Sequence, residues 1–316
     1  MIEFGLLIAG IIGLLIGAHL AVSAVTNLAE HYKISPLFLG LTLVTVGTDL
    51  PELVVSVTAS WQKLNGVETS GLILGNIVGS SMGQIGLSLG VLGVIATISL
   101  TKRRLTRDGL AAVFSVVLLF LAALDGVITR VEGVSLMIIY AIYFFMIYRE
   151  ERVTEKVARA PKIYPVWVAL SMIAGFALLI FSSEIVVENA LLLSSTWGVS
   201  QTWVGIVLVG LGTSLPELAI AISAIRKGSI GLSIGNLVGS NVFDLLFVIG
   251  GVAVVSELSV GDSLLRFHIP FLFLTSLLAL YFFKTRMKLH RKEAMTLLAM
   301  YGFYLGFTIF VGLAVG

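Results

Sequence analysis

Two stretches of this chain repeat one another, and each lies inside a long apolar segment. Residues 47–52 (GTDLPE) are matched by 212–217 (GTSLPE), and residues 71–80 (GLILGNIVGS) are matched by 231–240 (GLSIGNLVGS). The chain is therefore an internal duplication. In both copies, carboxylates, hydroxyls and a proline stand where an apolar segment would otherwise continue. Ionisable groups inside a membrane are costly, so they mark ion or substrate paths by default.

The composition around these motifs is that of a membrane protein. Hydrophobic residues make up 58% of the 316 residues, charged residues make up 12%, and the mean hydropathy is +1.06. Soluble domains usually carry about 25% charged residues. The net charge of +2 is too small to suggest a nucleic-acid partner, and the absence of cysteine removes disulfides and thiolate metal sites. We therefore expect a multi-pass protein of the cell membrane, with the lipid bilayer as its surroundings.

Hydropathy divides the chain into ten predicted membrane helices, each built around a span of about 20 residues. The first helix is expected to remain in the protein, because the N-terminus lacks the basic segment that begins a signal peptide. Lysine and arginine are concentrated in the odd-numbered connections, so the positive-inside rule places both termini outside. The approximate bounds are 3–28, 36–61, 70–98, 108–124, 133–148, 165–190, 201–225, 230–255, 265–283 and 293–315.

The two copies of the first motif lie in the second and the seventh predicted helix, five helices apart. A unit with an odd number of helices enters the membrane from opposite sides when it is duplicated in tandem, so the repeats are inverted. Inverted repeats with interrupted helices are typical of secondary transporters. The predicted organisation is an all-α membrane protein with a first five-helix repeat at 1–149 (motif region 40–90), a short cytoplasmic linker at 150–164, and a second repeat at 165–316 (motif region 205–250).

The first motif combines a helix break with a carboxylate. Its proline has no amide hydrogen, so the carbonyl four residues earlier loses its helical donor. In a bilayer that carbonyl needs another partner, and a bound cation can be that partner. Thr48 and Glu52, like Thr213 and Glu217, are four residues apart, so they share one helix face beside each break. An isolated hydroxyl usually bonds its own helix, but a mid-membrane carboxylate that recurs in matched context indicates function.

The second motif adds further oxygen atoms. Four-residue spacing places three polar side chains on one face of each helix, namely Asn76, Ser80 and Gln84 in the first copy and Asn236, Ser240 and Asp244 in the second. Ligands that are all oxygen suit Ca²⁺, Na⁺ or K⁺ and disfavour Zn²⁺ or Cu²⁺. Glycines at four-residue spacing let neighbouring helix backbones approach closely. We therefore expect the polar faces of both motifs to meet at one point.

These motifs resemble those of the sodium/calcium exchanger family, within the cation/calcium antiporter superfamily. The resemblance rests on the paired blocks and on the ending NVFD at 241–244, and the ten-helix plan extends it over the whole chain. It implies exchange of Ca²⁺ for Na⁺ by alternating access at a central carboxylate site, in a prokaryotic type without the large cytosolic regulatory insert. The implied ligands are Glu52, Glu217, Thr48 and Thr213 at the Ca²⁺ site, with Ser80, Ser214, Ser240, Gln84 and Asp244 around them and carbonyls near Thr45 and Gly210.

Two residues depart from the family's pattern. Asp49 stands where serine is common and adds a carboxylate to the candidate ligands, and Gln84 stands where asparagine or aspartate is usual. Either change alters how many Na⁺ bind or lets a proton replace one, so Ca²⁺/H⁺ antiport is the alternative function. Asp244 also resembles potassium-dependent relatives, which keeps K⁺ open as a participant. The residues of the first motif favour Na⁺ as the coupling ion, since proton-coupled relatives tend to carry Gly-Asn-Ala-x-Glu at that place.

Other classes of protein fit less well. A passive cation channel would use the same oxygens, but a buried site with several carboxylates predicts tight binding and slow release. The sequence holds no His-Glu-x-x-His, no Gly-x-Ser-x-Gly and no matched Ser/His pair, so we expect no enzymatic activity. No cofactor is expected besides the transported ions, Ca²⁺ and Na⁺. The sequence does not report an oligomeric state, and a monomer is compatible with it.

Overall fold

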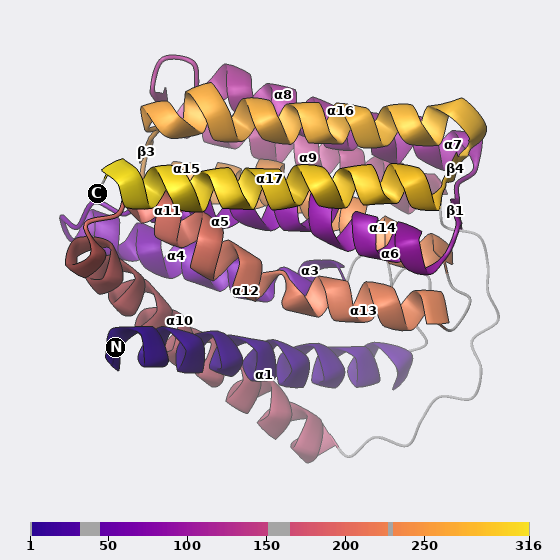
Figure 1. Cartoon of the computed structure of the whole chain (residues 1–316). Coiled ribbons are helices and arrows are strands. Elements are labelled where there is room, and N and C mark those ends of the chain that lie inside the picture. The colour runs from indigo at the N-terminus through magenta and orange to yellow at the C-terminus, as the bar shows by residue number, and fades with distance from the viewer. Residues whose placement is uncertain (1, 32–44, 151–164, 227–229, 316) are drawn as a thin grey trace.

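The computed structural model of the chain describes residues 2–31, 45–150, 165–226 and 230–315. Nearly all of these residues are helical, and most of the long helices run side by side in one bundle (Figure 1). The exceptions to helix and loop in the described ranges are four strands of two residues each. Both ends of the chain lie at the same end of the bundle (Figure 1). The all-helical prediction is confirmed.

The first half of the chain contains unbroken helices, one broken helix and short segments of wider π-helix, labelled η. Its elements are α1 (Ile2–His31), α3 (Thr45–Thr48), α4 (Leu50–Leu64), α5 (Ser70–Met82), η2 (Gly83–Ser88), α6 (Leu89–Ile95), β1 (Ile98–Ser99), α7 (Lys102–Arg104), η3 (Leu105–Gly109), α8 (Leu110–Ala122), β2 (Val127–Ile128) and α9 (Arg130–Glu150).

The second half follows the same order of elements. It comprises α10 (Pro165–Trp197), α11 (Gln201–Val204), η4 (Gly205–Gly210), α12 (Leu211–Thr213), α13 (Leu215–Arg226), α14 (Ile230–Val242), η5 (Phe243–Val248), α15 (Ile249–Val255), β3 (Leu258–Ser259), η6 (Leu264–His268), α16 (Ile269–Arg286), β4 (Lys288–Leu289) and α17 (Arg291–Val315).

Nine helical stretches in the described ranges are long and apolar enough to cross a membrane, and they coincide with nine of the ten predicted spans. The remaining span, predicted at 36–61, is described only from Thr45 onwards, and its first part lies outside the described residues. The total of ten and the placement of both termini outside therefore stay predictions. Helix α10 runs to Trp197 rather than to the predicted residue 190, because its last turns still pack on α1, where the rings of Phe4 and Trp197 are 6.0 Å apart.

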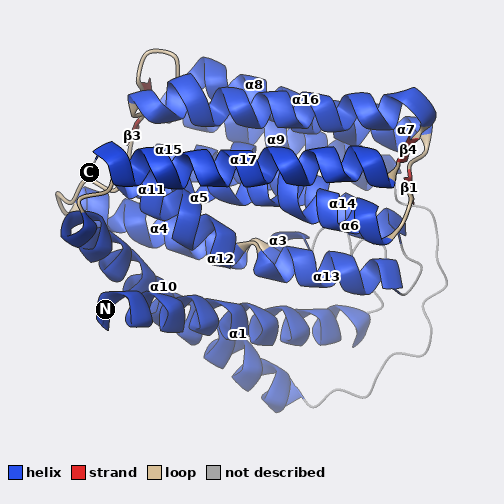
Figure 2. Ribbon diagram, in the orientation of Figure 1, coloured by secondary structure: helices blue, strands red, loops and turns tan. Residues whose placement is uncertain are grey.

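Both copies of the first motif interrupt their helix at the residue before Leu-Pro. Asp49 (φ −83°, ψ 2°) and Ser214 (φ −82°, ψ 2°) share one non-helical conformation, and α4 and α13 begin directly after them. Proline is favourable in a first helical turn, because the amide hydrogen that it lacks would have no helical partner there. Figure 2 shows the second break as a short loop between α12 and α13. The predicted interruptions are confirmed.

Both copies of the second motif end in a π-helical segment. Gln84 is the second residue of η2, and Asp244 is the second residue of η5. A π-turn holds an extra residue and is frequent at functional sites, because it turns side chains away from the regular helical spacing. The last polar residue on each of the two polar helix faces is therefore placed by a widened turn.

Two short antiparallel ribbons join the halves of the chain. Strand β1 pairs with β4, and β2 pairs with β3. Strands β1 and β3 follow the second motif in the first and second half respectively, yet they lie at opposite ends of the bundle (Figure 1). Equivalent segments at opposite ends are what an inverted arrangement requires. Each ribbon also ties one half of the chain to the other.

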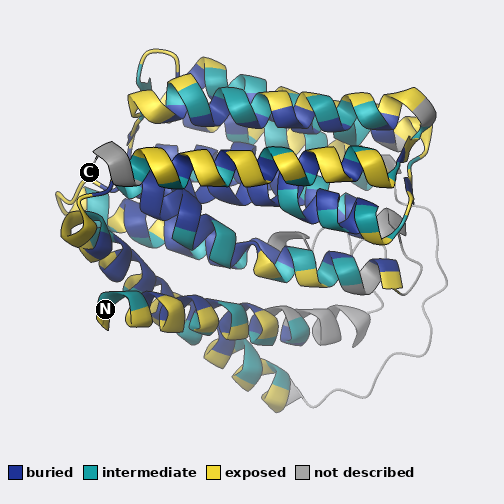
Figure 3. Ribbon diagram, in the orientation of Figure 1, coloured by how far each residue is buried: buried dark blue, intermediate teal, exposed yellow. Residues whose placement is uncertain are grey.

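The centre of the bundle is the contact between α5 and η4, where the backbones touch. A Cβ added at Gly75 would lie 2.6 Å from the carbonyl oxygen of Thr202, and one at Gly79 would lie 2.7 Å from the Cα of Ile206. One at Gly210 would lie 2.6 Å from the carbonyl oxygen of Asn76. These elements are mostly buried, whereas α16 and α17 expose part of their surface (Figure 3). The predicted close approach is confirmed for the first motif copy, and for 231–239 it stays a prediction.

Helices α1 and α10 form a crossed pair that packs on the broken helices. A Cβ added at Gly175 would lie 2.7 Å from the amide nitrogen of Ala21, so these backbones also touch. Small residues at such crossings allow close van der Waals packing inside a membrane. Helix α10 is joined to α4 by a hydrogen bond of 2.7 Å between the hydroxyls of Thr58 and Ser183.

Candidate cation site

The helix breaks and the π-turns bring the polar residues of both halves into the centre of the bundle. Every one of these side chains is at most 4% exposed. Those among the predicted ligands are Thr48, Asp49, Glu52, Ser80, Gln84, Thr213, Ser214, Glu217, Ser240 and Asp244. Groups that strongly prefer water are therefore gathered in the interior of a protein that is apolar outside. Such a cluster needs cations or hydrogen-bond donors to compensate it.

Glu52 is held from the neighbouring helix α5. The hydroxyl of Ser80 donates to Glu52 Oε1 over 3.1 Å. The side-chain amide of Asn76 lies 3.5 Å from the Glu52 carbonyl oxygen and 3.5 Å from the Ser56 hydroxyl. Glu52 Oε2 has no hydrogen-bond partner. One carboxylate oxygen is therefore positioned by protein and the other is available to an ion.

Asn76 also links the two halves. Its Oδ1 accepts a hydrogen bond of 3.3 Å from the hydroxyl of Thr213, which itself lies just before the second helix break. Asn76 belongs to the polar face that the sequence predicts, but it is not among the predicted ligands. Ser56 was not identified from the sequence, although its position four residues after Glu52 is a signal that could have found it. Both residues belong to the wall of the site.

The second helix break contains both predicted hydroxyls and a predicted carbonyl. The hydroxyl of Ser214 hydrogen-bonds the Gly210 carbonyl oxygen, and the hydroxyl of Thr213 lies 3.1 Å from the Val209 carbonyl oxygen. The structure therefore places Gly210 at the site with its carbonyl accepting from protein. Thr45 begins α3 on the equivalent stretch of the first half, and its side chain lies outside the described atoms.

Four carboxyl groups lie within electrostatic range of one another. Asp49 interacts with Glu217 and Glu52, and Asp244 interacts with Asp49 and Glu52. The charged groups that act on Asp49, Glu217 and Asp244 are other carboxyls of the cluster. Two unit charges about 4 Å apart interact by about 4 kcal/mol at an effective dielectric constant of about 20. The ionised cluster is therefore strongly unfavourable without bound cations.

Many oxygens of the cluster have no hydrogen-bond partner. Gln84 donates from Nε2 to Asp244 Oδ2 and to the Ser80 hydroxyl, each over 3.3 Å, which links the polar faces of the two halves. The buried oxygens without a partner include both carboxylate oxygens of Asp49 and Glu217, Glu52 Oε2, Gln84 Oε1, Ser240 Oγ and Asp244 Oδ1. Buried polar atoms are nearly always hydrogen-bonded in proteins, so these oxygens indicate a place for ions.

The acidic side chains are not arranged around one point, as the ligands of a zinc ion are. Within the described ranges, no three histidine, aspartate or glutamate side chains are placed to hold one metal ion together. The other oxygens gathered around these carboxyls belong to hydroxyl and amide side chains such as Ser80 and Gln84. Mixed oxygen shells of this kind suit hard cations such as Ca²⁺.

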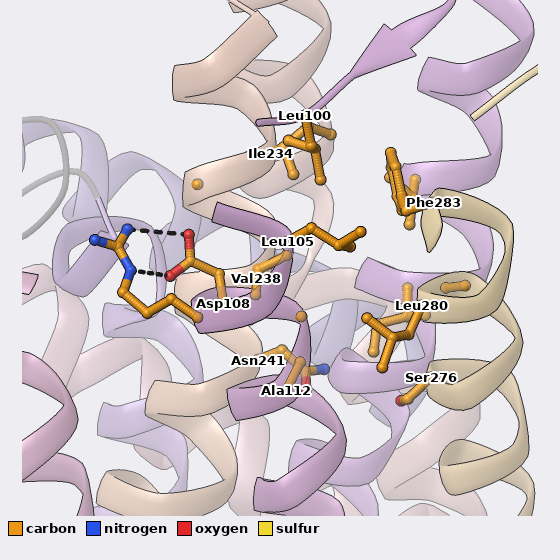
Figure 4. A pocket seen from close by; sticks show the side chains of 16 residues that line it. Leu100, Leu105, Asp108, Ala112, Ile234, Val238, Asn241, Ser276, Leu280 and Phe283 are labelled. Carbon is orange, nitrogen blue, oxygen red and sulfur yellow. Dashed lines mark hydrogen bonds and ion pairs between the residues drawn. The ribbon is translucent and has the colours of Figure 1, made fainter. Parts of the chain in front are cut away.

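A separate small cavity lies between α8, α14 and α16 (Figure 4). Its volume is about 60 Å³, and its lining is mainly apolar, including Leu105 and Phe283. Asn241 and Ser276 lie on its wall, and the ion pair between Arg107 and Asp108 lies at its edge. None of the four clustered carboxyls lines it, so this cavity is not the cation site.

The nine spans of the described ranges and the buried carboxyl cluster indicate the class of membrane transporters for cations. Comparison with known proteins refines this class. The family model described as sodium/calcium exchanger protein matches residues 2–149 and 167–310. The chain belongs to the sodium/calcium exchanger family, which is a family of membrane transporters rather than of catalytic enzymes.

Individual relatives agree with this assignment. The sodium/calcium exchanger MaX1 of Methanosarcina acetivorans is 27% identical, over 95% of this chain and 96% of that protein. The putative antiporter CaxA of Alkalimonas amylolytica is 32% identical, over 77% of each chain. A solved structure of the sodium-calcium exchanger NCX_Mj, soaked with Na⁺ and Sr²⁺, superposes with a TM-score of 0.68 at 26% identity, covering 97% of this chain and 98% of that one.

Proposed function

We propose that this protein is a secondary antiporter that exchanges Ca²⁺ for Na⁺ at the buried carboxyl cluster by alternating access. The observation that carries the proposal is the set of partnerless carboxylate oxygens on Asp49, Glu52, Glu217 and Asp244, gathered at the two helix breaks and at the π-segment η5. Membership of the sodium/calcium exchanger family and the likeness to MaX1 and NCX_Mj support it.

Ca²⁺ and Na⁺ would compete for the same oxygens. One Ca²⁺ takes Glu52 and Glu217, one from each half, with Thr48 and Thr213 beside them. Several Na⁺ ions compensate the same charge at the flanking oxygens around Asp49 and Asp244. An empty site leaves carboxylates uncompensated in a low-dielectric interior. The empty protein therefore switches between access from one side of the membrane and access from the other far less readily than the loaded protein. That difference couples the movement of the two ions.

The crossed helices α1 and α10 are the elements that would open and close the site. They pack chiefly on each other and on the broken helices, whereas the other helices are tied together by the ribbons and by the α5–η4 contact. Displacing the crossed pair along the remaining bundle would expose the cluster to one side at a time. The contact between Thr58 and Ser183 would then form and break in each cycle.

The test is ⁴⁵Ca²⁺ uptake into vesicles that hold the purified protein, driven in turn by outward gradients of Na⁺, K⁺ and H⁺. We expect uptake with Na⁺ inside and none with the other gradients. Glu217→Gln should abolish it, because one of the two central carboxylates loses its charge. Glu257→Gln is the matched control, since Glu257 is exposed in a loop after α15.

Ca²⁺/H⁺ antiport is the second candidate, and the fourth carboxyl favours it. One Ca²⁺ compensates two of the four carboxylates, and protons can compensate the other two as well as Na⁺ can. Uptake that is driven only by the H⁺ gradient would replace Na⁺ with H⁺ as the coupling ion. Flux that ignores all gradients would contradict antiport altogether and indicate a channel.

A further inference from the structure

Helix α9 brings a tyrosine to the back of the cation site. The helix is pressed against α15 near its start, where a Cβ added at Gly133 would lie 2.6 Å from the carbonyl oxygen of Gly250. Seven residues further along is two helical turns, or about 10 Å, on the same face. That residue is Tyr140, and α9 packs there against the π-segment η5. The close approach at Gly133 therefore fixes where the tyrosine ring lies.

Aromatic packing orients this ring. Tyr140 contacts Phe243 edge-on with ring centres 5.5 Å apart, and it contacts Phe247 with ring centres 5.3 Å apart. Phe243 directly precedes Asp244 in η5. The Tyr140 hydroxyl lies within electrostatic range of the carboxyls of Asp49 and Asp244. A phenol is thus held against η5, the segment that carries Asp244, by an element that holds none of the predicted ligands.

Three of the four carboxylate oxygens of these two acids have no hydrogen-bond partner. Gln84 donates to Asp244 Oδ2, but Asp244 Oδ1 and both oxygens of Asp49 have no partner. A carboxylate that binds an ion through one oxygen is normally hydrogen-bonded at the other, which fixes its orientation. Tyr140 is a neutral O–H donor, so it can serve that second oxygen without adding charge to the site.

We propose that Tyr140 is a positioning residue of the cation site, whose hydroxyl donates to the flanking carboxyls of Asp49 and Asp244 when they hold the coupling cation. The inference rests on the proposed function, in which Glu52 and Glu217 hold Ca²⁺ and the flanking acids hold Na⁺. It assigns a role to α9, and it makes Na⁺ affinity depend on a residue that does not touch the ion.

The chain offers a matched control on the same helix. Tyr143 lies one turn beyond Tyr140, and its hydroxyl lies 3.4 Å from Asp108 Oδ1. Asp108 is paired with Arg107 at 2.6 Å, at the edge of the small cavity in Figure 4. Removing the Tyr143 hydroxyl therefore deletes the same atom from the same helix, but away from the carboxyl cluster.

The experiment measures equilibrium ⁴⁵Ca²⁺ binding to the purified full-length protein and its displacement by Na⁺. For Tyr140→Phe we expect the Na⁺ concentration that displaces half of the Ca²⁺ to rise about tenfold, the lower end of the range for lost outer-shell partners of metal ligands. The Ca²⁺ dissociation constant measured without Na⁺ should change less than about threefold, because the carboxyls that interact with Tyr140 are those of Asp49 and Asp244 rather than the two central ones. Tyr143→Phe should leave both values unchanged.

A double variant separates positioning from general packing. If Tyr140 acts through Asp49, Tyr140→Phe should have much less effect in the Asp49→Asn background than in the wild type. The proposal would be overturned if the Ca²⁺ dissociation constant of Tyr140→Phe rose as much as its half-displacing Na⁺ concentration. It would also be overturned if Na⁺ displaced Ca²⁺ from Tyr140→Phe as it does from the wild type. If Na⁺ fails to displace Ca²⁺ from the wild type, the proposed function fails before the role of Tyr140 is reached.

Discussion

The contact between α5 and η4 leads to a sharp prediction for Gly79→Ala. The new Cβ would lie 2.7 Å from the Cα of Ile206, where ordinary contact begins at 3.4 Å. The two backbones must therefore separate by about 0.7 Å, since backbone atoms cannot rotate out of the way as a flexible side chain can. Overfilling a packed contact in this way costs about 1–3 kcal/mol.

The displacement reaches the site directly. The hydrogen bond between Thr213 and Asn76 crosses the same contact at 3.3 Å, and a shift of about 0.7 Å would break it. Ser80, which holds Glu52, directly follows Gly79. Functional sites have to be held to within about 0.5 Å. We expect Ca²⁺ affinity to fall at least about tenfold, which corresponds to about 1.4 kcal/mol.

Equilibrium ⁴⁵Ca²⁺ binding and the thermal unfolding midpoint of the purified protein measure this effect. The matched control is Gly302→Ala on α17, where an added Cβ meets nothing within 4 Å. Gly302→Ala should keep the wild-type affinity. A Gly79→Ala protein that binds Ca²⁺ as tightly as this control would refute the claim that backbone contact at α5 sets the geometry of the site.

Two further predictions concern contacts outside the carboxyl cluster. Ser183→Ala removes the hydrogen bond to Thr58, which is worth about 1 kcal/mol. Amide hydrogen exchange in α10 around this residue should therefore become about fivefold faster, and Thr58→Val should have the same effect. Unchanged exchange would show that this contact does not hold α10. Burial opposes ionisation of Glu68, but hydrogen bonds from Ser70 and the charge of Lys63 outweigh it and hold the pKa of this carboxyl below its usual 4.5. That stabilisation is present above pH 4.5 and is lost as the pH falls through the lowered pKa, so the unfolding midpoints of Glu68→Gln and wild type should differ slightly at about pH 7 and converge at about pH 3.

Much of the fold could be predicted from the sequence because the membrane imposes simple rules. Apolar length predicts the spans, and the prolines of the first motif correctly predict helix breaks at Asp49 and Ser214. Regular spacing correctly predicts that Gly75 and Gly79 face another backbone. These are local properties of one segment, or of a segment and a small-residue partner, so a pattern in the sequence is enough to find them.

The missed features depend on contacts between distant segments. The strands of the two ribbons are only two residues long, which is too short for any alternation of side chains to predict them. The π-turns at Gln84 and Asp244 follow no rule of composition. Tyr140 looks like one aromatic residue among several on a lipid-facing helix, and only the packing of α9 on η5 brings its hydroxyl near the acids. The individual roles of the predicted ligands stay predictions until ion binding is measured.

The ribbons also dictate an order of events while the chain is being made. Strand β1 is synthesised at residues 98–99 but pairs with residues 288–289, and β2 at 127–128 pairs with 258–259. At a usual rate of about 5–20 residues per second, β1 waits on the order of 10–40 s for its partner. The first half therefore sits in the bilayer with an unpaired strand at each end until the second half arrives. The partner of β2 is made before α16 and the partner of β1 only after it, so β2 is closed before β1.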